Sequence, residues 1–283
     1  MTGQTVNGRT HTYHAEAKVI EGHLQLPLVQ EIKPQAHAYL PPHGGYGSQR
    51  SEGFRVEEVL SYRSGHTQVG GNRSPKATEG WSTLTSFVVE GLNVLDVLTA
   101  DRVVGQIVTD HPLKGYVPTI SFLGTRFDNL RIAGHPVHLE LDLGILGPKP
   151  QDDKPYGLDA DIKKRITAQY NRILGSPNLP GEERERYNQL SSTLGRAEAV
   201  ECSLVNNAPG GYPGACFGHR IHVPNFGWIT LAKVRSTYKE VKEGNELHKR
   251  TTVHLSMIEL CLGCAASGSG TIASGSSNGQ TVP

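Results

Sequence analysis

The chain has 283 residues, a formal net charge of +1 and only 19% charged residues. No stretch approaches the ~20 consecutive apolar residues of a membrane-spanning helix, and no basic stripe marks a surface for nucleic acid. Glycine and proline are abundant, with 33 and 17 residues, which is typical of short strands joined by turns. We therefore predict a mainly β fold that neither spans a membrane nor binds nucleic acid.

The N-terminal segment, residues 1–75, alternates loosely between apolar and polar residues, as in FRVEEVLSYRSG (54–65). PPHGGYG (41–47) interrupts this pattern with turn residues. The first residues, MTGQTVNGRTHTYHAEA, lack the charged start and apolar run of a signal peptide. We expect a β-rich segment that packs with the main domain.

The main domain is predicted over residues 76–147 and 196–270. Strand-length runs such as WSTLTSFVVEGLNVL (81–95) and LTADRVVGQIVTDH (98–111) are separated by Gly, Asn, Asp or Pro, and the pattern resumes with HRIHVPNFGWITLAKV. These runs predict an antiparallel β-sandwich. Residues 271–283, rich in Gly and Ser, are expected to form a flexible tail.

Residues 148–195 differ from the rest, because apolar residues recur there with the period of a helix. Ile162, Ile166, Tyr170, Ile173 and Leu174 form one stripe, and Tyr187, Leu190 and Leu194 form a second. Asp159 or Asp161 can cap the first helix, and Gly175 and Gly195 stand where the helices would end. We predict a two-helix hairpin inserted between strands.

The stretch GHPVHLELDLGI (134–145) is the first candidate for chemistry. As a strand it would place His138, Glu140 and Asp142 on one face and three leucines on the other. It resembles the active strand of laminarinase-like glycosidases, in which two carboxylates lie about 5 Å apart. Gly144 stands where the second glutamate would be, so a solvated polar face explains the same residues.

Histidines give an alternative, metal-binding interpretation. GHPVH (134–138) and GHRIH (218–222) share a pattern, and the chain has 13 histidines. His138 and Glu140, together with His219 or His222 from a neighbouring strand, could bind zinc. The main interpretation has no cofactor and treats these histidines as surface residues and strand ends.

Four cysteines, Cys202, Cys216, Cys261 and Cys264, are compatible with two disulfides. Pairing of near neighbours is preferred, since a Cys202–Cys216 bond would close the turn-rich loop SLVNNAPGGYPGA. Cys261 and Cys264 would form the second bond. Free thiols are the alternative.

A family resemblance follows from STLTSFVVEGLNVLDVLTADRVVGQIVTDH, FLGTRFDNLRIAGHPV, NFGWITLAKV and the closing pair TVHLSMIEL and GTIASGSSN. These stretches, over about residues 80–145 and 220–278, resemble the strand pattern of bacterial choice-of-anchor proteins, particularly type P. The resemblance implies an extracellular, sheet-built domain held at the cell surface by an exchangeable C-terminal anchor. Such domains have no known biochemical function, and the resemblance does not imply an enzyme. The hairpin at 159–195 departs from that pattern.

We therefore predict a non-enzymatic extracellular or cell-surface protein with a structural or adhesive role, acting by self-association or by contact with surface proteins or polysaccharide. Free edge strands could pair with neighbouring copies. The alternatives are a hydrolase or metal protein using the His138 face, and a carbohydrate-binding module. The module would need coplanar exposed aromatic side chains from Tyr46, Trp81, Tyr212 and Trp228.

Overall fold

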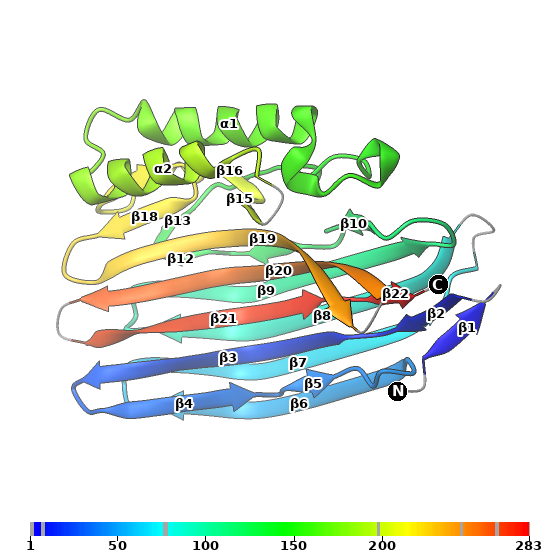
Figure 1. Ribbon diagram of the computed structural model, residues 1–283. Helices are drawn as coiled ribbons and strands as arrows, with labels where there is room; N and C mark the ends of the chain where they lie inside the picture. The colour runs from blue at the N-terminus through cyan, green and yellow to red at the C-terminus, as the bar shows by residue number, and fades with distance from the viewer. Residues whose placement is uncertain are drawn as a thin grey trace.

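Two antiparallel sheets dominate the fold. The structure is a computed structural model that describes residues 3–6, 9–75, 79–196, 199–243, 246–263 and 266–282. Figure 1 shows the two sheets as stacked layers, with two helices beyond one edge. The predicted mainly β, antiparallel sandwich is confirmed.

The first layer is an eight-stranded sheet. Its strands run in the order β13-β12-β9-β8-β7-β6, and β10 and β11 also pair with β9, so that three short strands together follow the edge of β9. All pairings are antiparallel. The strands are β6 (Gly45–Val56), β7 (Leu60–Arg73), β8 (Glu79–Val94), β9 (Leu98–Pro112), β10 (Thr119–Ser121), β11 (Arg126–Asp128), β12 (Arg131–Ile132) and β13 (His135–Pro136).

The second layer is a nine-stranded sheet in the order β17-β18-β19-β20-β21-β3-β4, with β15 on β19 and β5 on β3. Segments from both ends of the chain meet here, since β3 pairs with β21. The strands are β3 (Ala15–Leu26), β4 (Gln30–Gln35), β5 (Ala38–Tyr39), β15 (Ala199–Ser203), β17 (Ala215–Phe217), β18 (Arg220–Val223), β19 (Gly227–Glu243), β20 (Glu246–Gly263) and β21 (Ser267–Ser277).

The expected C-terminal tail is wrong. Residues 271–277 belong to β21, which lies inside the nine-stranded sheet between β20 and β3. Small residues suit this place because they let the two layers approach closely. The chain then enters a three-stranded sheet, which consists of β1 (Gln4–Val6), β2 (Arg9–Thr12) and β22 (Gln280–Val282).

The core lies between the inner faces of the two layers. Phe87 of β8 is fully buried there. A Cβ added to Gly105 would lie 1.9 Å from its ring, and one added to Gly275 of the opposite sheet would lie 2.5 Å from it. These two glycines therefore make the space for the ring. Thr109 Oγ1 and Ser277 Oγ, 2.7 Å apart, add a hydrogen bond between the layers.

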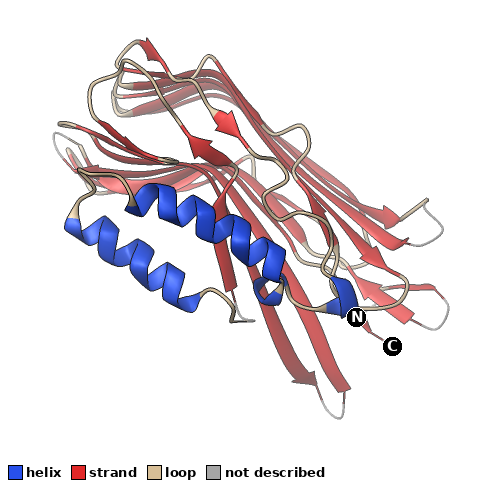
Figure 2. Cartoon of the chain, turned by 90° about the horizontal axis from the view of Figure 1, so that it is seen from above, coloured by secondary structure: helices blue, strands red, loops and turns tan. Residues whose placement is uncertain are grey.

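The predicted helical hairpin is present as α1 (Ala160–Leu174) and α2 (Gly181–Thr193), which lie side by side in Figure 2. The Asp159 carboxylate caps α1 by accepting from the backbone N–H groups of Asp161 and Ile162, each at 3.0 Å. The expected stripe is confirmed: Ile162, Ile166, Tyr170 and Ile173 are buried and Leu174 packs against the core. Two short 3-10 turns, η1 (Gln151–Asp153) and η2 (Tyr156–Leu158), precede α1.

Among the described residues, neither helix is long and apolar enough to cross a membrane.

Candidate functional site

The stretch 134–145 does not form the single strand that its alternation predicts. His135 and Pro136 form β13 and pair with β12, whereas Glu140 and Leu141 form β14 (Glu140–Leu141) and pair with β16 (Val205–Asn207). The register shifts between Glu140 and Leu141. The Asp142 carboxylate instead accepts a hydrogen bond from the backbone N–H of Gly144 at 3.0 Å and shapes a turn. His138, Glu140 and Asp142 therefore do not share one regular strand face, because the register shifts between Glu140 and Leu141 and a turn begins at Asp142.

The residues of the alternative metal-binding interpretation do not come together. His138 is exposed, whereas His219 is 5% exposed and its Nε2 lies 3.1 Å from the hydroxyl of Tyr187 on α2. His222 lies beside the Trp228 ring, with the ring centroids 4.9 Å apart. Within the described ranges, no group of three or more His, Cys, Asp or Glu side chains could hold a metal ion.

The GHRIH motif instead holds the helical hairpin onto the nine-stranded sheet. Arg220 Nη2 donates to Glu183 Oε1 of α2 at 2.6 Å, and Arg220 Nη1 donates to Thr230 Oγ1 at 2.8 Å. Burial, with the charge of Arg220, lowers the pKa of His219 to about 3, so this imidazole is neutral at pH 7. We call Glu183, Tyr187, His219 and Arg220 the helix dock.

The predicted disulfide between Cys202 and Cys216 is wrong, because both residues are free thiols. Cys202 pairs with Val234 of β19, whereas Cys216 lies two strands out from Ile229. Five residues along a strand correspond to about 16 Å, far beyond the reach of a disulfide. Cys261 is free as well, and Cys264 lies outside the described residues.

The aromatic residues expected for a carbohydrate-binding module do not form an exposed platform. Trp81 is fully buried and stacks on His11, with ring centroids 5.0 Å apart. Tyr212 is buried, Trp228 is half-buried and Tyr46 is exposed. Two of the four predicted aromatic side chains, Trp81 and Tyr212, are therefore part of the hydrophobic core.

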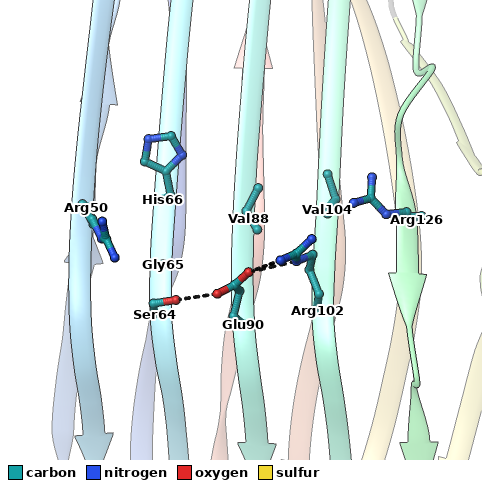
Figure 3. A pocket seen from close by; sticks show the side chains of 9 residues that line it. All are labelled: Arg50, Ser64, Gly65, His66, Val88, Glu90, Arg102, Val104 and Arg126. Carbon is teal, nitrogen blue, oxygen red and sulfur yellow. Dashed lines mark hydrogen bonds and ion pairs between the residues drawn. The ribbon is translucent and has the colours of Figure 1, made fainter.

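A hollow lined by several charged side chains lies on the outer face of the eight-stranded sheet. Strand register aligns one row across five strands: Arg50, His66, Val88, Val104 and Arg126. The neighbouring row contains Ser64, Glu90 and Arg102. With Gly65 they line a hollow of about 420 Å³ (Figure 3), and we call these nine residues the arginine groove.

Glu90 is the fixed centre of the groove. Its carboxylate accepts from Ser64 Oγ at 3.0 Å and from Arg102 Nε at 2.9 Å, as the dashed lines in Figure 3 show. Arg63 Nη2 lies 3.7 Å away. The bonds from Arg102 and Ser64, with the charges of Arg102 and Arg63, lower the pKa of Glu90, so this side chain is a carboxylate at neutral pH.

The arginines at the two ends of the groove are accessible. The side chain of Arg50 is 69% exposed and pairs with Glu52 at 2.6 Å. Arg126 is 48% exposed and pairs with Asp128 at 3.4 Å, and Figure 3 shows it reaching from β11 towards Val104. Exposed pairs of this kind contribute little to stability, so a ligand can compete for both guanidinium groups.

Sequence reasoning missed this site. The alternate positions of SFVVEGL and TADRVVG already place Val88 with Glu90 and Arg102 with Val104 on single strand faces. Joining them to Arg50 and Arg126 requires the register of five strands, which the sequence does not contain.

The described residues form a two-sheet β-sandwich with a docked helical hairpin and a charged groove on one open face. A family model described as "Domain of unknown function (DUF8256)" matches residues 11–237, and the chain belongs to this family. Among curated proteins none matches the chain, and among solved structures none matches it.

Proposed function

We propose that this protein is a non-enzymatic structural or adhesive module of the cell surface that binds its partner through an outer sheet face. The arginine groove is the observation that carries the proposal. Its charged groups stand on neighbouring strands of one sheet, so the hydrogen-bonded ladder fixes their spacing. An open, rigid surface of this kind suits recognition of a large partner.

Edge-strand pairing is the weaker route to assembly. The edge strand β6 pairs with β7 alone within its sheet, but it carries exposed Arg50, Glu52 and Arg55. Gly53 adds a left-handed residue, with φ of 58°. Charges and backbone irregularities on an edge strand oppose pairing with another chain. We therefore place partner binding on the sheet face.

The cell-surface location rests on the resemblance of residues 80–145 and 220–278 to the choice-of-anchor pattern. The cysteines no longer support it, since Cys202, Cys216 and Cys261 are unpaired. The hydrolase alternative is not proposed, because His138, Glu140 and Asp142 do not share a strand face.

Protease treatment of intact cells that make the protein tests the location, with a cytoplasmic enzyme as the internal control. We expect the protein to be degraded while the control enzyme survives. Beads coated with the full chain should also adhere to these cells. Protection of the protein until lysis, together with no adhesion of the beads, would overturn the proposal.

A further inference from the structure

The arginine groove combines three kinds of surface. Guanidinium groups stand at both ends and in the second row, Val88 and Val104 form an apolar floor between them, and Ser64, His66 and Glu90 add polar groups. The row from Arg50 to Arg126 crosses four strand spacings, or about 19 Å. A ligand that reaches both ends must therefore be extended.

We propose that the arginine groove binds an acidic polysaccharide, an extended sugar chain that carries uronic acid carboxylates. The proposal rests on the proposed function and names the class of partner. Guanidinium groups recognise carboxylates with paired N–H donors, and Arg50 and Arg126 are exposed enough to do so.

The spacing of charge favours a polymer with separated carboxylates. Arg50 and Arg102 lie on strands three spacings apart, and Ser64, Val88 and His66 stand between or beside them. In a uronate chain the carboxylates are likewise separated by hydroxyl groups and by the apolar C–H faces of the rings. The valine floor can contact those faces, and polar side chains can bond the hydroxyls.

Glu90 has a defined place in this arrangement. Ser64, Arg102 and Arg63 hold its carboxylate in one position, with its second oxygen 3.0 Å from Ser64 Oγ. A fixed carboxylate accepts hydrogen bonds from sugar hydroxyls. It would repel a ligand whose negative charges are as closely spaced as the phosphates of a nucleic acid.

Nucleic acid is disfavoured for the same reason. Glu52, Glu90 and Asp128 alternate with the arginines across the groove and its margin. A DNA duplex presents one negative charge per ~1.7 Å of its axis, so the carboxylates would meet phosphates. None of the nine groove residues is a Trp, Tyr or Phe on which a base could stack.

Calorimetric titration of the full-length chain with de-esterified polygalacturonate tests the proposal. Fully methyl-esterified polygalacturonate and single-stranded DNA serve as comparison probes. The groove variant is Arg50→Gln/Arg126→Gln. Its matched control is Arg55→Gln/Arg172→Gln, which makes the same change of net charge at exposed arginines outside the groove.

We expect the de-esterified polymer to bind at least tenfold more tightly than the methyl ester and the DNA, and less tightly as salt is added. The groove variant should bind at least tenfold more weakly than the wild type, and the control variant within twofold of it. Equal loss in both variants, binding of the methyl ester with equal affinity, or tighter binding of DNA would overturn the proposal. If the groove variant melts at a clearly lower temperature, Arg126→Gln alone replaces it.

The two proposals fail in different ways. A protein that is degraded on intact cells but does not bind polygalacturonate would refute the groove inference alone. A protein that binds the polymer through Arg50 and Arg126 but resists protease until lysis would refute the surface location alone.

Discussion

The arginine groove and the helix dock both pair guanidinium groups with carboxylates, but they differ in burial. In the helix dock, the side chains of Arg220 and Glu183 are 10% and 11% exposed, and the pair joins α2 to β18. In the groove, Arg50 and Arg126 are 69% and 48% exposed, and each pairs with a carboxylate of its own strand.

This difference separates charges that hold the fold from charges that can bind a partner. A buried ion pair cannot lose one member without leaving an uncompensated charge in the interior. An exposed pair is solvated on both sides and exchanges partners at little cost. Mutation of an arginine should therefore lower the stability of the fold in the dock and weaken ligand binding in the groove.

The largest effect is expected in the dock. Arg220→Ala should lower the free energy of unfolding by about 3–5 kcal/mol, because it leaves the Glu183 carboxylate buried without its partner. Urea denaturation followed by circular dichroism measures this change. Arg172→Ala, at an exposed position of α1, is the control. The double variant Arg220→Met/Glu183→Leu should recover part of the loss, and a change below about 1 kcal/mol for Arg220→Ala would contradict a structural role for the pair.

Buried histidines should make the fold sensitive to acid. Burial lowers the pKa of His111 to about 4, and burial with the neighbouring His111 lowers that of His11 to about 2. Their stabilising contribution is complete above the unfolded pKa of about 6.5 and is lost as the pH falls below it. For His111 this loss amounts to about 3 kcal/mol between pH 6.5 and 4.

Urea midpoints measured from pH 7 to pH 4 test this expectation. The variant His111→Leu should lose about 3 kcal/mol less than the wild type over that range. His135→Leu, at an exposed position, is the control variant. Parallel pH profiles for wild type and His111→Leu would show that the imidazole is not buried in its neutral form. His111→Gln serves if the leucine variant does not fold.

Glu90 belongs to the groove but is intermediate in burial between the two regions, since its side chain is 26% exposed and has several partners. Glu90→Gln should lower the free energy of unfolding at pH 7 by about 1 kcal/mol or less, because solvent screens the interaction. Its lowered pKa makes this contribution present at neutral pH and lost as the pH falls through that pKa. Wild type and variant should therefore converge in acid. A constant difference at every pH would mean that packing, and not charge, is responsible.

The smallest effect on stability is expected at the ends of the groove. Arg50→Gln/Arg126→Gln should change the free energy of unfolding by less than about 0.5 kcal/mol, because both ion pairs are exposed. Thermal melts of this variant, the wild type and Arg55→Gln/Arg172→Gln measure it. A loss comparable to that of Arg220→Ala would remove the distinction between the two regions.

The periodicity of apolar residues correctly predicted those helices and strands whose pattern lies within one continuous segment of the chain. Helical periodicity from Ile162 to Ile173, with Asp159 as cap, gave the first helix of the hairpin, and alternation over 81–111 gave the central strands. The alternation of polar and apolar residues predicted one strand over 134–145, and this was wrong. The residues that form the turn at Asp142 alternate in the same way as those of a strand. Low hydrophobicity suggested a tail at 271–283, but residues 271–277 form part of an internal strand, in which Gly275 leaves space for the Phe87 ring of the other layer.

Only the tertiary structure decided which distant residues share a surface. The groove depends on the register of five strands between residues 50 and 126, and the dock depends on a helix that returns to a strand 37 residues away. It also decided that Arg220 is buried whereas Arg50 is exposed. Strand register places Cys202 and Cys216 too far apart for a disulfide. The sequence by itself determined local backbone preference, because that depends on neighbouring residues, whereas burial and charge pairing depend on contacts between segments far apart in the chain.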